Sequence, residues 1–449
     1  MQALVFVPGT MGTELCDASG DLLWPPTPLE TQFGYGRIAE LLAEGVKPRD
    51  IVRSVACFGV YEPLLDQLQE LKFTAQGSDR RLYPFPYDWR ADLEQTADRL
   101  AALLDRAHAE GAREIHIVAH SMGGLISRLV LETGRYDSRP WFGNLRSFLA
   151  LASPHQGAPL ALARILGLDS TLGVSKSGFR RLTNDERYPS AYQLLPAPTE
   201  RACWDQQDLS VGALDIYDPA VAAALGLNAR LMARARWVHD SLAAGQAPAQ
   251  VRYFYFAGTG HETVTRVNVV RVGDHFPVEE MVLTRTEDAG DGTVPFWSAL
   301  PRPVQKQVVV NEHMRVFRGL AFKRVFYRLL GGDLGVPLQS MGRTETDEGL
   351  QLSMATPVVE AGHGFELLLV PSGDVERLAG RLVIHRLAQD GKAVDAGEDL
   401  TRVSYEGPAI SRLRVRMPAL AEPGLYRMSF VGTPARSDPL PFAVASLGD

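Results

Sequence analysis

The part of the sequence that most constrains the fold is residues 115–124, with the sequence IHIVAHSMGG. Its first half is an apolar run typical of a buried strand, and a helical pattern starts after Ser121 and continues to about Gly134. A strand can turn this sharply into a helix only if the residues two before and two after the central residue are small. Ala119 and Gly123 occupy these positions. The segment therefore predicts a nucleophile elbow at Ser121, and a chance Ser-x-Gly at the end of a strand is the alternative.

Strand-like and helix-like stretches alternate around this segment through the first 330 residues. This alternation is typical of a parallel sheet covered by helices. The expected strands are residues 4–7, 114–119, 147–152, 251–256 and 307–310, and the expected helices are residues 61–71, 93–107 and 122–134. Between about 156 and 250 the chain is rich in Ala, Pro and Arg and shows no convincing strand. We expect this insertion to be a helical cap over the site.

The hydrophobic pattern changes after a break at residues 331–337, which contain three glycines and a proline. Apolar residues then recur at every second position in several short stretches, as in a β-sandwich. We expect residues 1–335 to form an α/β-hydrolase catalytic domain, with the cap at about 156–250. Residues 345–449 should form a small all-β sandwich, immunoglobulin-like and accessory, which docks a partner rather than contributing to catalysis. On this hypothesis a chain that ends near Gly332 keeps its activity.

Composition excludes several other classes of protein. The net charge of −7 argues against a nucleic-acid partner. No uncharged apolar run reaches the roughly 20 residues of a membrane span, and the N-terminus does not resemble a signal peptide, so a cytoplasmic location is expected. Cys16, Cys57 and Cys203 fit no zinc pattern and are expected to be free thiols. No metal or cofactor is predicted.

A serine hydroxyl needs a base, and the base in turn needs an acid to orient it. Of the ten histidines, only His313 follows a predicted strand, lies in a short polar turn and precedes a helix. The order serine, acid, histidine then favours Asp291, because the glycines beside it allow an unusual backbone. Asp288 is the local competitor, and a simple hairpin turn is the alternative for the Asp-Gly pair.

Two backbone N–H groups are candidates for an oxyanion hole. Met122 follows the nucleophile at the start of a helix, where its N–H is free. The second donor should come from the loop after the first strand, residues 8–12, in which the N–H of Thr10 is best placed. The glycines of that loop are also compatible with a sharp turn and no further role.

Several segments together resemble the lecithin:cholesterol acyltransferase family of α/β-hydrolases, which includes lysosomal phospholipase and phospholipid:diacylglycerol acyltransferases. They are VPGTMGTEL (7–15), PYDWR (86–90), AHSMGG (119–124), SPHQGAP (153–159), PSAYQLLP (189–196) and GDGTVP (290–295). The resemblance spans residues 3 to about 330. It implies an acyl-enzyme mechanism on ester lipids, with Ser121, Asp291 and His313 as the triad and with Thr10 and Met122 as the oxyanion hole.

Three functions follow as expectations. The first is a serine ester hydrolase, a lipase, phospholipase or esterase, that transfers the acyl group to water. The second is an acyltransferase that passes the acyl group to an alcohol. The third is an effector or scaffold subunit that docks a protein partner through the β domain.

Other residues have more ordinary interpretations. Asp88 and Arg90, on a probable strand end, are expected to form a local ion pair, and His155 is expected to be a loop residue. Two basic amphipathic stretches of the cap, residues 160–182 and 227–242, either pack on the core or touch an anionic membrane.

Overall fold

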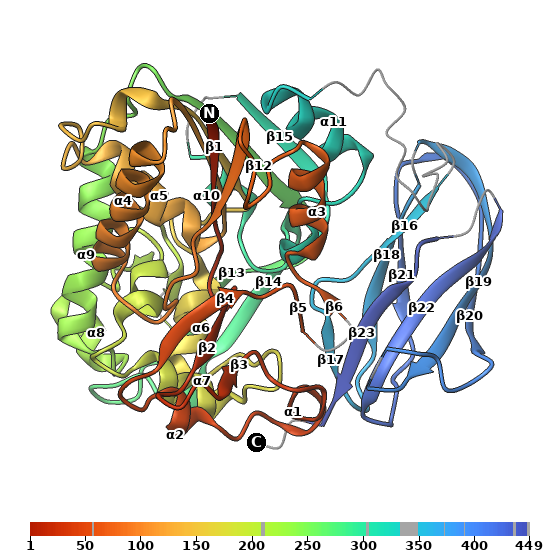
Figure 1. Ribbon diagram of the computed structural model, residues 1–449. Coiled ribbons are helices and arrows are strands. Elements are labelled where there is room, and N and C mark those ends of the chain that lie inside the picture. Colours follow the sequence, from red (N-terminus) through yellow and green to blue (C-terminus); the bar gives the residue numbers. More distant parts are fainter. Residues whose placement is uncertain are drawn as a thin grey trace.

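The computed structural model describes residues 1–55, 58–207, 212–301, 305–332, 349–371, 373–389, 391–433 and 437–446. Its centre is a six-stranded parallel sheet with the order β15-β12-β9-β8-β1-β7 (Figure 1). The strands are β1 Gln2–Val7, β7 Arg80–Pro84, β8 Glu114–His120, β9 Leu145–Leu151, β12 Arg252–Thr259 and β15 Gln305–Val310. The predicted α/β-hydrolase fold is confirmed. The edge strand β7 was missed because it begins with two arginines and ends at a proline.

Helices cover both faces of this sheet (Figure 1). Alternate residues of β1 face opposite sides, so Val5 joins the core on one side and Phe6 joins the core on the other. The first core contains apolar residues of α4 Leu93–Ala109 and α5 Met122–Glu132. The second contains those of α3 Glu62–Glu70 and α11 Leu320–Leu329. Both faces of the sheet are therefore buried, as the near-continuous apolar strands require.

The cap region contains strands that the sequence did not suggest. β10 Cys203–Asp205 and β11 Ala213–Leu214 join β13 His261–Val269 and β14 Val282–Gly290 in a second sheet, with the order β11-β10-β13-β14. The prediction of a strand-free insertion at 156–250 is wrong. β10 and β11 are too short to show periodicity, and they pair with a hairpin that follows the insertion in the sequence.

The cap helices are α6 Pro159–Leu166, α7 Lys176–Thr183, α8 Pro219–Ala224 and α9 Ala229–Ala244. On α9, Leu231, Val238 and Leu242 are buried. The basic side chains of α9 are paired with acids: Arg230 with Glu186, Arg234 with Asp92 and Glu94, and Arg236 with Asp240. The packing explanation of this amphipathic stretch is therefore confirmed. Among the described residues, no helix has the length and apolar character needed to cross a membrane.

The N-terminal region adds two small sheets and two short helices before α3. β2 Thr13–Cys16, β3 Leu22–Trp24 and β4 Lys47–Ile51 form one sheet, and β5 Ser54–Val55 pairs with β6 Phe58–Gly59. The helices are α1 Pro28–Phe33 and α2 Ile38–Leu41. Cys16 and Cys203 are free and buried, as predicted, and Cys57 lies outside the described residues.

The C-terminal part is built from two sheets, one of three strands in the order β16-β18-β21 and one of five in the order β17-β23-β22-β19-β20. The strands are β16 Leu350–Ser353, β17 Val358–Glu360, β18 Phe365–Pro371, β19 Val375–Leu387, β20 Glu398–Ile410, β21 Leu413–Met417, β22 Gly424–Thr433 and β23 Leu440–Ala445. The predicted C-terminal β structure is confirmed. The expected boundary between 335 and 345 lies outside the described residues, so the division into domains stays a prediction.

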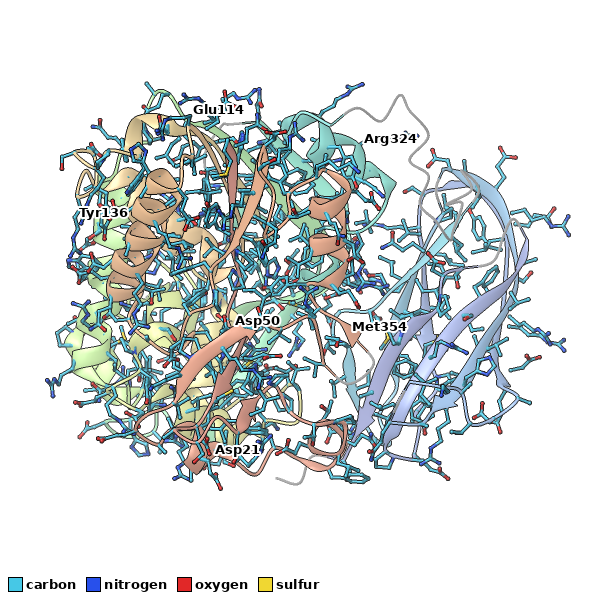
Figure 2. All side chains as sticks on the ribbon, in the orientation of Figure 1. Asp21, Asp50, Glu114, Tyr136, Arg324 and Met354 are labelled. Carbon is cyan, nitrogen blue, oxygen red and sulfur yellow. The ribbon has the colours of Figure 1, made fainter. Side chains whose placement is uncertain are left out.

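The C-terminal sheets pack directly against the rest of the chain. Helix α1 contacts β22 and β23, and the Ser446 N–H donates to the Gln32 carbonyl at 2.9 Å. His261 Nε2 and Ser353 Oγ are 2.9 Å apart, both buried. Figure 2 shows Met354 where the C-terminal sheets meet the remainder of the molecule. These contacts argue against a catalytic unit that is complete at Gly332.

A chain truncated after Gly332 is expected to unfold at a lower temperature than the full chain and to lose activity on a small soluble ester. The reason is that truncation removes the partners of buried His261 and of α1. Calorimetry and nitrophenyl butyrate hydrolysis measure the two effects. Full-chain Arg381→Ala, which breaks an exposed ion pair with Asp399, is the control and should behave like the wild type. A truncated chain with unchanged unfolding temperature and activity would restore the modular hypothesis.

Candidate active site

The turn between β8 and α5 holds Ser121 in a strained conformation. Its φ of 52° and ψ of −126° lie outside the regions that a non-glycine residue normally occupies. The turn is also crowded, because a Cβ atom at Gly123 would stand 2.4 Å from the Val7 carbonyl oxygen. Only glycine fits there, which explains the small residue that the elbow pattern requires. The predicted strand–serine–helix junction is present at the C-terminal end of the central strand β8.

The structure brings the three predicted triad residues together. His313 Nε2 lies 2.9 Å from Ser121 Oγ, and His313 Nδ1 lies 2.9 Å from Asp291 Oδ2. His313 begins a short turn after β15, and Asp291 directly follows β14. All three residues are buried, Asp291 most completely at 1% exposure. This geometry permits proton transfer from the serine to a histidine whose orientation is fixed by the carboxylate.

The backbone around Asp291 fixes its orientation. Asp291 Oδ1 accepts from the N–H groups of Thr293 at 3.0 Å and Val294 at 2.7 Å, so Oδ2 is left for His313. The competing carboxylates face other partners. Asp288 pairs with Arg412 at 2.7 Å and Arg414 at 3.2 Å.

A hydrogen-bonded chain that the sequence did not reveal connects the loop after β1 with the candidate base. The Gly9 N–H donates to the Tyr61 hydroxyl at 2.8 Å, and the hydroxyl lies 2.8 Å from His120 Nδ1. His120 Nε2 lies 3.0 Å from the His313 carbonyl oxygen and must be its donor. Burial holds the pKa of His120 well below its usual value, so its ring is neutral and Nδ1 accepts from Tyr61. The role of Tyr61 could not be read from its place in an ordinary amphipathic pattern.

The same chain of bonds favours Thr10 as an oxyanion donor. The N–H groups of Gly9 and Gly12 are already used, the first by Tyr61 and the second by the Gly9 carbonyl. The Thr10 N–H donates to no acceptor among the described residues, and Thr10 Oγ1 lies 3.4 Å from Met122 Sδ. Met122 is the first residue of α5, where an N–H group has no acceptor within the helix. Thr10 and Met122 therefore flank Ser121 with free donors.

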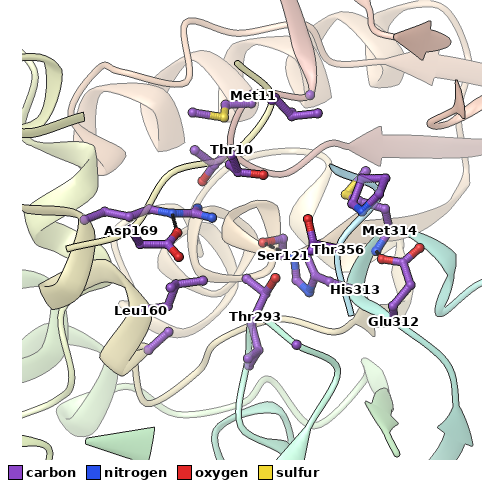
Figure 3. A pocket seen from close by; sticks show the side chains of 18 of the residues that line it. Thr10, Met11, Ser121, Leu160, Asp169, Thr293, Glu312, His313, Met314 and Thr356 are labelled. Atoms are coloured by element: carbon purple, nitrogen blue, oxygen red, sulfur yellow. Dashed lines mark hydrogen bonds and ion pairs between the residues drawn. The ribbon is translucent and has the colours of Figure 1, made fainter. Parts of the chain in front are cut away.

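Thr10, Ser121 and His313 line a pocket of about 330 Å³ (Figure 3). Its wall is formed by the loop after β1, the cap, the turns that carry Asp291 and His313, and part of the C-terminal sheets. Apolar cap residues in this wall are Leu160, Leu172, Phe179 and Leu182. Arg90 also lines the pocket, but it is paired with Asp88 at 2.7 Å as predicted, although β7 ends before both residues. The His155 ring packs against the Tyr255 ring, with the ring centroids 4.7 Å apart.

Two arginines beside the candidate base differ from the other arginines of the pocket. Arg164 and Arg285 are both paired with Asp169, whereas Arg315 and Arg318 form no ion pair with a described carboxylate. Each makes one side-chain hydrogen bond within the described chain, Arg315 to the Leu352 carbonyl at 3.3 Å and Arg318 to the Gly59 carbonyl at 2.7 Å.

The Nε atoms of both arginines are buried and have no hydrogen-bond partner in the part of the chain that the structure describes. Burial lowers the pKa of Arg318 to about 10 and raises the pKa of neighbouring Glu312 to about 7. Burial thus disfavours the charged form of Glu312, and Asp438 is a second carboxylate that acts on both arginines. This end of the pocket can bind an anionic group. The two arginines that follow His313 at positions 315 and 318 are the only sign of this feature in the sequence around His313.

Residues 54–211 match the family model of lecithin:cholesterol acyltransferase, and this match includes Ser121. "Lecithin-cholesterol acyltransferase-like 4" of Arabidopsis thaliana is 24% identical over 300 residues, which cover 54% of this chain and 55% of the relative. The predicted similarity to this family is confirmed. "Uncharacterized protein YJR098C" of Saccharomyces cerevisiae is 31% identical over 147 residues, covering 32% of this chain and 21% of that protein. The chain thus spans about half of the first relative and about a fifth of the second.

One solved structure supports the α/β fold of the chain. A chain of the Tle4-Tli4 complex has a TM-score of 0.54 at 14% sequence identity, and the match covers 74% of this chain and 98% of that chain. The mature lipase BlEst2 of Bacillus licheniformis has a TM-score of 0.37 at 14% identity, covering 73% and 91% of the two chains. At this level of identity the first likeness shows the fold alone.

Asp291→Asn should lower kcat for ester hydrolysis by several orders of magnitude, on the order of 10³ to 10⁴, because the amide no longer fixes the histidine tautomer. Asp288→Asn is the matched control. It removes a nearby carboxylate whose ion pairs are partly exposed, so kcat should stay close to that of the wild type. Steady-state kinetics on nitrophenyl butyrate, with circular dichroism to confirm folding, compares the two variants. A severe loss in Asp288→Asn together with a mild one in Asp291→Asn would show that the wrong carboxylate was chosen.

Proposed function

We propose that the protein is a serine ester hydrolase that cleaves acyl esters of lipids through an acyl-enzyme on Ser121. The observation that carries the proposal is the pair of 2.9 Å contacts that connect Ser121, His313 and Asp291. This arrangement lies at the wall of a pocket with apolar cap residues. A nucleophile, a base and an orienting acid in this order form the minimal machinery for acyl transfer.

In the first half-reaction, Ser121 Oγ attacks the ester carbonyl carbon while its proton passes to His313 Nε2. The negative charge that develops on the carbonyl oxygen is stabilised by the N–H groups of Thr10 and Met122. His313 then gives the proton to the leaving alkoxide, and the bond between the acyl carbon and the leaving oxygen breaks. The acyl group remains on Ser121. Asp291 stabilises the imidazolium during both proton transfers.

In the second half-reaction, a water molecule attacks the acyl carbon and passes a proton to His313. The bond to Ser121 Oγ breaks, and the serine recovers its proton. An alcohol that takes the place of water gives a new ester by the same steps. The second candidate, an acyltransferase, therefore needs no different machinery, and it is favoured by the likeness to the acyltransferase family.

The pocket supports a lipid rather than a small polar ester as the substrate. Its cap side presents apolar side chains to an acyl chain, among them Leu160, Leu172 and Leu182. Its lining also contains Arg315 and Arg318, which form no ion pair with a described carboxylate. A glycerophospholipid carries both an apolar acyl chain and an anionic phosphate. Among the ester hydrolases, we therefore favour a phospholipase.

A protein partner has one supporting observation, which does not say which part of the chain would bind it. The solved structure with the TM-score of 0.54 is a complex, Tle4-Tli4. A protein partner, a location in the cytoplasm and a reversible contact of the cap with a membrane all stay predictions. The arginines of α9 already pair with acidic residues, which weakens the argument that this helix binds an anionic membrane.

Incubation with a mixed lipid extract, with and without a long-chain alcohol, tests the proposed reaction. Mass spectrometry of the products should show free fatty acid and lysophospholipid in the absence of the alcohol. These products should disappear with Ser121→Ala, because only binding and oxyanion effects would remain. If new esters predominate whenever the alcohol is present, the acyltransferase is the better description. Hydrolysis that persists in Ser121→Ala would contradict the proposal.

Replacing both buried arginines tests the phospholipid preference. Arg315→Met combined with Arg318→Met should reduce kcat/KM for a phosphatidylcholine by roughly tenfold or more, because charged hydrogen bonds to the phosphate are lost. Hydrolysis of a diacylglycerol with the same acyl chains should fall much less, so the ratio of the two kcat/KM values should change. Arg164→Met, whose native charge is already paired with Asp169, is the matched control within the same pocket. If the double variant lost the same factor in kcat/KM on both lipids, the proposed anion site would be contradicted.

A further inference from the structure

The connection between β16 and β17 enters the candidate active site from the C-terminal sheets. Met354, Ala355, Thr356 and Pro357 line the same pocket as Ser121 and His313. Figure 3 shows Thr356, Ser121 and His313 around one part of this pocket. We name residues 354–357 the C-terminal wall. No motif of the resemblance covers these residues, since it ends near residue 330.

The C-terminal wall lies directly against the loop that carries Asp291. Gly292 has a φ of +90°, and a Cβ atom there would stand 2.6 Å from the Ala355 carbonyl oxygen. A side chain at this position would therefore displace the wall or the loop. The close approach of two backbones at Gly292 places the wall within contact distance of the candidate acid's own turn.

Three further contacts fix the C-terminal wall in place. Ser353 Oγ lies 2.9 Å from His261 Nε2, on the strand paired with β14. Gln351 Nε2 donates to Asn311 Oδ1 at 3.1 Å, two residues before His313. The Leu352 carbonyl accepts from Arg315. The wall is thus attached on both sides of the His313–Asp291 pair. A shift of the wall would therefore also shift residues of the candidate site.

The C-terminal wall lies beside His313, and this location determines which part of a bound ester contacts the wall. In an ester cleavage the histidine donates its proton to the oxygen of the leaving alcohol, so that alcohol must lie next to Nε2. The acceptor that resolves the acyl-enzyme enters by the same route, because it returns its proton to the same nitrogen. Thr356 is exposed, and its hydroxyl group bonds only to the backbone of Val358 among the described residues. Its bulk can therefore be changed without breaking a long-range contact.

We propose that the C-terminal wall selects the alcohol portion of the ester, with Thr356 as the residue that limits its bulk. This proposal rests on the proposed function and adds to it the element that chooses the leaving group and the acceptor. In the transfer step, the acyl carbon–Oγ bond of Ser121 breaks and a bond to the acceptor oxygen forms. The acceptor proton goes to His313 and then to Ser121. A smaller side chain at position 356 leaves room beside His313 for an alcohol as well as for water.

The test compares full-length variants on two series of esters. One series keeps a butyryl group and varies the alcohol from methanol through ethanol and isopropanol to cyclohexanol. The other keeps methanol and varies the acyl group from two to twelve carbons. Thr356→Leu should lower kcat/KM for the cyclohexyl ester relative to the methyl ester by roughly tenfold or more, since one or two added methylenes in a tight pocket have effects of this size. Its acyl-length profile should match that of the wild type.

Two further variants complete the test. Thr356→Val keeps the size of the side chain and should keep the wild-type ratio of kcat/KM between the cyclohexyl and methyl esters. Thr401→Leu makes the same enlargement in β20, outside the pocket, and should behave like the wild type. Thr356→Ala should raise the yield of butyryl transfer to added isopropanol. A Thr356→Leu enzyme whose acyl profile shifts while its alcohol profile does not would overturn the proposal. A wild type without Ser121-dependent activity on the methyl ester would instead contradict the proposed function, and the inference would fail with it.

Discussion

The strained turn at Ser121 is the constraint on which the candidate site depends. A positive φ at a non-glycine residue costs on the order of 1–3 kcal/mol, so the surrounding packing must hold it in place. The structure does so by close approach: Gly123 meets the Val7 carbonyl, and a Cβ atom at Gly9 would stand 2.6 Å from Ser121 Cβ. The strand that precedes the candidate oxyanion loop and the strand that precedes Ser121 are neighbours in the sheet. The candidate nucleophile and the candidate donor are therefore positioned by the same packing contacts.

The base is held by a second, longer-range set of contacts. His120, next to the nucleophile, lies 3.0 Å from the carbonyl of His313, so the serine turn and the histidine turn are directly connected. From the other side, the C-terminal sheets contact Asn311 and the loop of Asp291. The candidate site is therefore surrounded by segments from most of the chain, from the loop after β1 to the connection between β16 and β17. This distribution explains why the C-terminal part packs closely on the rest of the chain instead of extending from it.

Local signals in the sequence predicted most of the central sheet and led to the candidate triad, whose catalytic roles stay predictions. The elbow, five of the six strands of the central sheet and the residues Asp291 and His313 each follow from short patterns, because sterics and periodicity act between near neighbours. What was missed depends on pairing across the chain. β10 and β11 have three and two residues; β10 pairs with β13, and β11 pairs with β10. The Tyr61–His120 bond and the place of Thr356 in the pocket connect segments far apart in sequence, and a pattern within one segment cannot show them.

The most direct measurement is identification of the residue that becomes acylated or phosphonylated. The full-length protein is treated with a fluorophosphonate, digested and analysed by peptide mass spectrometry, with Ser121→Ala in parallel. A single adduct on the peptide that contains Ser121, absent from the variant and slowed by Asp291→Asn, is the predicted result. Labelling that persists in Ser121→Ala, or an adduct on another serine, would contradict the assignment of the nucleophile.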